Sequence, residues 1–283
     1  NDKAGLNALI RWISATPVKR IVYEPTGAYH RLFEETLSAA GLPLVKVNPL
    51  QARRFAQACG QRAKSDAADR RSLARMGMAL ELDCTAAPSK TQRDLKALQG
   101  ARQALIKDRT AAKNRAKQIT LVLVQKQNAK RLRQIEDDLK AIEASMLKLV
   151  NTQAQLKQRL QIISSIPGIG QVTALSMIVE IPELGRLDAK QAASLAGLAP
   201  HPRESGQWKG KRFIGAGRKL LREALYMPAL VASRFNPDMK DKYDQLTNAG
   251  KPPKLAITAI MRKLIILANT LIKNNRMWTA KMA

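Results

Sequence analysis

The chain has almost none of the residues from which zinc sites, disulfide frameworks and histidine-based catalysis are built. Its 283 residues include two histidines, His30 and His201, and two cysteines, Cys59 and Cys84, which lack the spacing of metal ligands. A zinc site and a mechanism that needs several imidazoles are therefore nearly excluded. So few cysteines also indicate a reducing, cytoplasmic setting.

Aromatic and acidic residues are scarce as well. Aromatics make up 4% of a chain that is 45% hydrophobic, a composition that favours helices over sandwiches or barrels. The 22 acidic residues face 49 basic ones, which gives a net charge of +27. Such a chain repels itself unless a polyanion is present, so nucleic acid is the expected partner. A protein that is merely basic is the alternative.

Long apolar runs are missing too. No secretory signal is present, and the run LIILANTLI near the C-terminus is too short to span a bilayer, so we expect no membrane partner. The chain begins at Asn1 without a methionine, which suggests that an upstream part of the protein is absent from it.

The first 88 residues have the pattern of an α/β domain. Short apolar segments at 18–25 and 42–49 each stop at a proline and read as buried strands, and 27–41 between them has helical periodicity. Strand, helix and strand within about thirty residues indicate a βαβ unit with a parallel pair.

Residues 89–163 change character, with a single glycine and no proline after 91. A break near QKQNA (125–129) predicts an antiparallel helical hairpin. From 132 to 163, steps of three and four form a heptad seam with one polar interruption, and this pattern is typical of a coiled coil that associates two chains. Two amphipathic helices that pack within one chain are the alternative. The seam consists of Leu132, Ile135, Leu139, Ile142, Met146, Leu149, Gln153, Leu156, Leu160 and Ile163.

Residues 164–283 predict a mainly helical third domain, so the fold class is α/β plus α. The stretch SSIPGIGQVTALSMIVEIP reads as helix, turn and helix, like the helix–hairpin–helix DNA-binding turn. Gly168 and Gly170 would let backbone amides approach a phosphate at a helix N-terminus, although a plain tight turn is also possible.

Three carboxylates stand at positions that suit catalysis. Glu24 follows a predicted strand, where α/β sheets place their sites. Asp66 and Asp69 are spaced i, i+3 at the start of a helix, so they share one face, although Asp66 could simply cap that helix. If all three meet, they need a cation, and oxygen ligands select Mg²⁺ or Mn²⁺. The combination of a basic protein and such a site points to a phosphodiester enzyme.

A cation-rich loop around PRESGQWKGKR (202–212) supplies the other candidate site. Ser205 could be a nucleophile, but from this stretch alone a phosphate-binding loop is the more natural reading, because no nearby group activates the hydroxyl. Trp208 could stack on a base or sugar. The candidate phosphate contacts of the loop are Arg203, Lys209, Lys211, Arg212, Arg218, Lys219 and Arg222, and those of the first domain are Arg53, Arg54 and Lys64.

Several of these stretches together resemble one family. The segment from YEPTGAYH to DAADRRSLA, and the motifs IPGIGQVTA, LAGLAPHPRESGQWKGKR and GRKLLREALYMPALVASR, resemble the DEDD-type insertion-sequence transposases, a group that includes the Piv DNA invertases. The motifs fall in the family's order, and the resemblance covers nearly the whole chain.

This resemblance implies a RuvC-like, RNase H-type domain whose Asp-Glu-Asp-Asp cluster binds Mg²⁺. Glu24 matches the family's glutamate, Asp66 and Asp69 its last two aspartates, and Ser205 its serine nucleophile, which is thought to join covalently to DNA. The first aspartate would lie on a strand upstream of the glutamate, and no such strand is present in this sequence. The resemblance also implies a bridge RNA that guides donor and target DNA, and action as a dimer or tetramer.

Two other functions stay open at this point. The first is a metal-dependent nuclease or junction resolvase in which water attacks and Ser205 only binds phosphate. The second is a helical nucleic-acid scaffold without catalysis, which the lack of the first aspartate favours.

Overall fold

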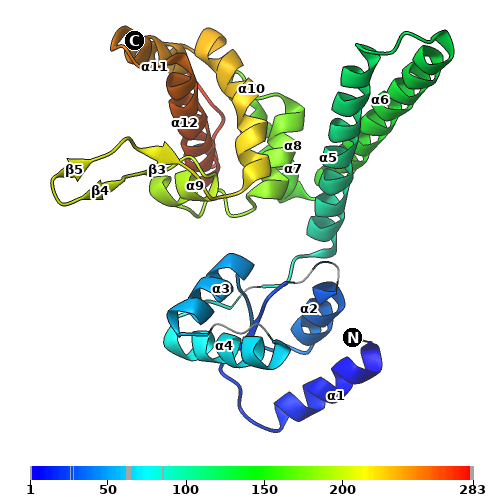
Figure 1. The fold of residues 1–283 in the computed structure, drawn as a ribbon, viewed down its shortest axis with the longest axis vertical. Helices are drawn as coiled ribbons and strands as arrows, with labels where there is room; N and C mark the ends of the chain where they lie inside the picture. The colour runs from blue at the N-terminus through cyan, green and yellow to red at the C-terminus, as the bar shows by residue number, and fades with distance from the viewer. Residues whose placement is uncertain (1, 26, 28, 62–64, 85, 281–283) are drawn as a thin grey trace. The chain divides into compact units, whose positions relative to one another are not determined.

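The computed structural model of the chain describes residues 2–25, 27, 29–61, 65–84 and 86–280. Within these residues the chain is mainly helical with a few short strands (Figure 1). It divides into two compact units, Asn1–Ser89 (unit 1) and Lys90–Ala283 (unit 2), which are described one at a time.

Unit 1 is built around a pair of parallel strands. Strand β1 (Ile21–Tyr23) pairs with β2 (Leu44–Lys46), and helix α2 (His30–Ala39) connects them. The βαβ arrangement expected from the sequence is therefore confirmed. The other helices of the unit are α1 (Lys3–Ser14), α3 (Pro49–Ala58) and α4 (Asp66–Ala79).

The two faces of this strand pair bury separate clusters. Tyr23 and Leu44 pack with Leu37 and residues of α1 on one face, while Val45 packs with Met76 and residues of α3 on the other. Successive strand residues point to opposite faces, so a short strand can serve both clusters. Unit 1 is thus a small three-layer α/β arrangement.

Unit 2 is helical apart from one ribbon of short strands, and it buries the larger core. Its elements are α5 (Lys90–Ala116), α6 (Val122–Asn151), α7 (Ala154–Ser164), α8 (Gln171–Glu180), α9 (Ala189–Leu195), β3 (Pro200–His201), β4 (Glu204–Ser205), β5 (Trp208–Lys209), β6 (Phe213–Ile214), α10 (Lys219–Phe235), α11 (Pro237–Asn248) and α12 (Pro253–Lys273).

Helices α5 and α6 form an antiparallel hairpin, as the sequence predicts, but the turn lies elsewhere. It falls between Ala116 and Val122, so the predicted break at 125–129 is wrong. Glutamine, lysine and alanine are good helix formers, and a polar stretch of them does not end a helix. Asn128 in this stretch is buried, and its Nδ2 donates to the carbonyl of Ala112 at 3.1 Å, which ties the two helices together.

The heptad seam crosses a helix break. Thr152 and Gln153 separate α6 from α7, so the seam predicted for 132–163 is divided between two helices, and the division falls at its one polar interruption. Gln153, its polar position, is in an extended conformation, and its Nε2 donates to Thr91 Oγ1 at 2.7 Å. Part of the seam is buried within the chain, at Ile135, Leu139 and Met146. Packing within one chain therefore accounts for these positions, and association of two chains through the seam stays a prediction.

Helix α12 closes the core of unit 2. It has 21 residues, so the apolar run singled out in the sequence is only part of it, and by length and composition the helix could cross a membrane. Nine of its side chains are buried, however, and seven of these belong to the main core. This is the packing of a core helix in a globular unit.

Candidate functional site

Glu24 lies at the carboxyl edge of the strand pair of unit 1, directly after β1. The chain leaves the same edge after β2 at Asn48, whose side-chain oxygen accepts the amide of Leu50 and begins α3. Parallel strands end at the same edge of a sheet, where α/β folds commonly bind ligands. The exposed carboxylate of Glu24 is therefore accessible at this edge.

The two aspartates occupy the first turn of α4. The helix is capped by Ser65, whose Oγ accepts the amide of Ala68 at 3.3 Å, so the alternative in which Asp66 is the cap is wrong. Asp66 is exposed, whereas Asp69 is half-buried and accepts a hydrogen bond from Gln61 Nε2 at 3.2 Å. Both negative charges are favourable at a helix N-terminus, whatever else they bind.

Helix α4 runs antiparallel to β1. Arg20 Nη1 donates to the carbonyl of Leu80 at 2.8 Å, and a Cβ on Gly77 would stand 2.7 Å from Val22 Cγ2. The end of α4 therefore lies beside the start of β1, and its first turn points toward the carboxyl edge. The fold thus directs Asp66 and Asp69 to the end of unit 1 that carries Glu24.

These carboxylates do not make a closed metal site. Within the described ranges, no group of three or more His, Cys, Asp or Glu side chains lies close enough together to hold an ion. The oxygen donors are of the type that Mg²⁺ prefers, but their arrangement does not fit a bound ion. Like charges repel one another, which favours such a spread arrangement.

Tyr23 is the last residue of β1, and its phenol keeps its proton. Burial raises the pKa of its phenol well above the usual range, and the carboxylate of Glu34 adds to the increase. Glu34 is itself buried and accepts a hydrogen bond from Lys46 Nζ at 3.0 Å, which joins α2 to β2. Tyr23 therefore stays neutral and serves to fix the end of β1.

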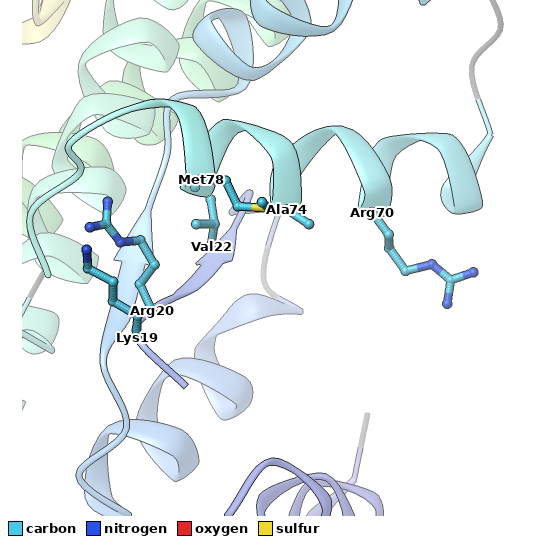
Figure 2. A pocket seen from close by; sticks show the side chains of 7 residues that line it. Lys19, Arg20, Val22, Arg70, Ala74 and Met78 are labelled. Atoms are coloured by element: carbon cyan, nitrogen blue, oxygen red, sulfur yellow. The ribbon is translucent and has the colours of Figure 1, made fainter. Parts of the chain in front are cut away.

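A basic hollow of about 570 Å³ lies between β1 and α4 (Figure 2). In Figure 2, Lys19 and Arg20 stand together near the end of α4, and Arg70 extends from its first half. The remaining lining is apolar and comes from Val22, Ala74, Gly77 and Met78. Three cations and no carboxylate are among the residues that line this hollow, so it forms a basic surface of the kind that attracts phosphate.

The predicted serine loop is a β-ribbon that projects from unit 2 (Figure 1). Ser205 pairs with Trp208 in the β4–β5 ladder, so Gly206 and Gln207 form the two-residue turn between them. Gly206 has φ of +57°, the left-handed conformation that such turns require and that glycine adopts without strain. Ser205 is exposed and lies next to the tip.

The basic side chains of the ribbon are exposed to solvent. Arg203, Lys209, Lys211 and Arg212 are all exposed. Arg203 lies over the ring of Phe213, 5.4 Å from its centroid, which supports the base of the ribbon. The ring of Trp208 lies across Gly210, where an added Cβ would stand 2.4 Å from it, yet 60% of this tryptophan is exposed. The ribbon thus presents cations and an aromatic face beside Ser205.

The base of the ribbon, in contrast, is locked. The amide of Arg218 donates to the carbonyl of Leu195 at 2.7 Å. A Cβ on Gly217 would stand 2.2 Å from the amide nitrogen of Gly197, so the two backbones touch. Ala216, directly before Gly217, has φ of +54°, a strained conformation for alanine. A rigid base and an open tip hold Ser205 away from the body of unit 2.

Two of the predicted phosphate contacts have partners inside the protein. Arg218 binds both carboxylate oxygens of Glu183, at 2.6 and 2.7 Å, and also the carbonyl of Glu180. Arg222 donates to the carbonyl of Ala216 at 2.7 Å. These contacts hold the ribbon base, and a role of either arginine in binding nucleic acid stays a prediction.

The Arg218–Glu183 pair makes stability depend on pH. The hydrogen bond to Glu183 raises the pKa of Arg218. Burial alone would raise the pKa of Glu183, but hydrogen bonds and the charge of Arg218 outweigh it, and the pKa falls below its ordinary value of 4.5. A carboxylate with a depressed pKa stabilises the folded state above its unfolded pKa, and this contribution disappears as pH falls through the folded pKa.

We therefore expect Glu183→Gln to lower the free energy of unfolding by about 1–2 kcal/mol at pH 7, because it breaks a charge-assisted pair that is partly exposed. The loss should shrink as the pH approaches 3. Urea unfolding of both proteins from pH 7 to pH 3 measures this. Glu223→Gln, which removes the exposed i, i+4 partner of Lys219, is the matched control and should change little. An equal loss in both variants would contradict the assignment.

The turn that resembles a helix–hairpin–helix lies between α7 and α8, but its two glycines differ. Gly168 has φ of +100°, and an added Cβ would stand 2.8 Å from the amide nitrogen of Ala232, so α10 covers it. Gly170 caps α8, is exposed, and has no atom within 4 Å of an added Cβ. Only Gly170 therefore stands where a phosphate could approach the amides of α8.

The remaining predicted contacts are scattered. Arg53 and Arg54 are exposed on α3, Lys219 is exposed at the start of α10, and Lys64 lies outside the described residues. The sequence predicts a loop at 202–212, whereas the structure forms a ribbon there; Gly206 at the first position of a two-residue turn is the one hairpin signal in this stretch. A groove near Tyr226 was not predicted, because the sequence holds no motif for it.

A strongly basic protein with a small α/β unit, exposed carboxylates at its strand edge and a serine on a cationic ribbon belongs to the class of nucleic-acid-processing proteins. Comparison with known families is more specific. A DEDD transposase model matches residues 1–126, and the model "Transposase IS116/IS110/IS902 family" matches residues 160–244.

The relatives agree with these matches. The pilin gene-inverting protein of Moraxella lacunata is 32% identical over 98% of this chain and 88% of its own length, and that of Moraxella bovis gives the same values. A 42 kDa protein of insertion element IS900 from Mycobacterium paratuberculosis is 29% identical over 49% of this chain and 37% of its own length. The chain therefore belongs to the IS110-type transposase family, together with the pilin gene-inverting proteins.

Proposed function

We propose that this chain is an RNA-guided DNA recombinase of an insertion sequence that cuts and rejoins DNA through Ser205. The observation that carries the proposal is the position of this serine. It is exposed beside the turn of a ribbon whose base is locked to unit 2. The four exposed cations of the ribbon can hold the phosphates on either side of a scissile bond.

The proposed reaction of Ser205 is a phosphoryl transfer. Its Oγ attacks phosphorus and loses its proton, a Ser–O–P bond forms, and the bond from phosphorus to one deoxyribose oxygen breaks. That oxygen takes up a proton and leaves as a hydroxyl. The number of phosphoester bonds is conserved, so attack by the hydroxyl of another strand end can release Ser205 and rejoin DNA without an energy source.

Glu24, Asp66 and Asp69 stay predicted ligands of Mg²⁺ or Mn²⁺ in this proposal. The common direction of the three carboxylates and the exposure of Glu24 and Asp66 support it, whereas the lack of a closed cluster among the described residues weighs against a preformed site. A bridge RNA and association into a dimer or tetramer belong to the same proposal. The net charge of +27 supports a second nucleic acid besides the DNA.

The proposal is tested by trapping the covalent intermediate. The full chain is incubated with Mg²⁺, candidate guide RNA and DNA of an element end, and adducts are mapped by peptide mass. We expect DNA on the peptide that contains Ser205, and only with RNA present. An adduct without RNA would remove the guide from the proposal. Cleaved DNA without an adduct would make the protein a metal-dependent nuclease, and RNA binding without cleavage would make it a scaffold.

A further inference from the structure

Unit 2 contains a basic groove outside the serine ribbon, and most of its α10 residues lie on the half of that helix far from the ribbon. A groove of about 570 Å³ runs between α10, α11 and α12. The side chains of Leu230 and Ile257 form its apolar floor, and Ile257 is only 6% exposed. None of the groove residues belongs to the serine ribbon or to the carboxylate edge.

The walls of the groove carry one cation from each helix. Arg234 comes from α10, Lys240 from α11 and Lys254 from α12, and all three are exposed. No ion pair of these three cations is found within the part of the chain that the structure describes. Asp244 is the one acidic residue among those that line the groove. The excess of positive charge in a concave site favours a ligand with several negative charges.

Two tyrosines line the same groove. Tyr226 of α10 is 42% exposed, and Tyr243 of α11 is half-buried. Aromatic rings beside cations are the combination that binds single-stranded nucleic acid, because bases stack on the rings while the cations hold the phosphates. A duplex keeps its bases stacked inside and cannot use such rings.

The groove is also preformed. Asn236, which is fully buried, ends α10 and caps α11, where its side-chain oxygen accepts the amide of Met239 at 3.3 Å. Its Nδ2 donates to the carbonyl of Pro167 at 3.4 Å, in the turn before α8. The angle between α10 and α11 is therefore fixed by a buried residue, so binding requires little ordering of the backbone.

We propose that this groove binds an unpaired nucleic-acid strand. Phosphates lie between Arg234, Lys240 and Lys254, and at least one base stacks on Tyr226. The helical rise places Tyr226 roughly 12 Å along α10 from the ribbon base at Arg218. A strand held at the ribbon can therefore continue into the groove. The proposal needs only that the protein binds nucleic acid, and it does not depend on Ser205 as nucleophile.

The test measures binding of the full chain to short fluorescent probes: oligo-dT, oligo-rU and a blunt DNA duplex. We expect Tyr226→Leu, which keeps an apolar side chain without a ring, to weaken single-strand binding about tenfold and duplex binding less than twofold. Arg234→Ala combined with Lys254→Ala should make the log–log salt dependence shallower by roughly 1.4, or about 0.7 for each lost phosphate contact.

Two controls make the outcome decisive. Lys190→Ala removes an exposed cation of α9 outside the groove, and Tyr226→Phe keeps the ring. Tyr226→Phe should bind single strands as tightly as the unchanged protein does. The groove proposal is overturned if Tyr226→Leu binds single strands normally, if it weakens duplex binding equally, or if Lys190→Ala changes the salt slope as much as a groove cation does. If Tyr226→Leu weakens binding to only one of the two single-stranded probes, that probe identifies the strand as DNA or as RNA. Thermal melting identifies any variant that fails to fold.

Discussion

Ser205→Ala is expected to reduce strand cleavage and rejoining by at least about 10³-fold, because removal of a covalent nucleophile leaves only the binding contribution to catalysis. DNA affinity should stay within about threefold, since the ribbon keeps its cations and its turn. Ser205 is exposed and the β4–β5 ladder uses backbone groups, so the substitution should leave the melting temperature unchanged. The measurement is single-turnover recombination of element-end DNA.

The chain offers a matched control for this experiment. Ser194 is an exposed serine of α9 in the same unit, and Ser194→Ala should recombine DNA at the normal rate. Ser205→Cys, which keeps a nucleophile of similar size, should retain some covalent adduct. A Ser205→Ala protein that cuts DNA as fast as the control would show that water attacks and that the serine only binds phosphate.

Gly168→Ala is expected to cost about 2–5 kcal/mol of the free energy of unfolding. Two effects add: alanine is strained at φ of +100°, and its Cβ would stand 2.8 Å from both the Cβ and the amide nitrogen of Ala232. The clash involves backbone of α10 and cannot be relieved by rotating a side chain. Urea unfolding measures the loss, and the same variant should lower the yield of folded protein.

Gly170→Ala is the paired experiment two residues away. Its φ is −78° and an added methyl group meets no atom within 4 Å, so we expect a loss below about 1 kcal/mol. If the start of α8 contacts phosphate, this variant should instead weaken DNA binding while it remains folded. Equal destabilisation by both substitutions would contradict the view that Gly168 serves packing and Gly170 faces solvent.

The sequence determined much of this protein by local pattern. The apolar segments around Val22 and Val45 predicted a parallel pair, because a strand, a helix and a strand within a short length leave little choice of topology. The i, i+3 spacing of Asp66 and Asp69 placed both on one face of a helix start. The order of motifs predicted the family, which the comparisons confirm.

Helix ends in the hairpin show where local pattern failed. The sequence placed a break at 125–129, yet that stretch continues as helix and buries Asn128 against Ala112. It also identified Gln153 only as a polar interruption within the seam, whereas α6 has already ended there and the contact with Thr91 on α5 accompanies a new helix start. In both cases a side-chain hydrogen bond to a residue distant along the chain accompanies the observed structure, and periodicity contains no information on such a bond.

Only the tertiary structure decided which of the candidate residues are free to meet a ligand. Arg218 and Arg203 look alike in the sequence. In the structure Arg218 is paired with Glu183, whereas Arg203 lies on an exposed ribbon. Gly168 and Gly170 share one motif, but α10 covers the first. The sequence fixes residue type and local spacing, whereas accessibility depends on which distant backbone and charges pack against each residue. Because function depends on accessibility, predicting the function required both the sequence and the tertiary structure.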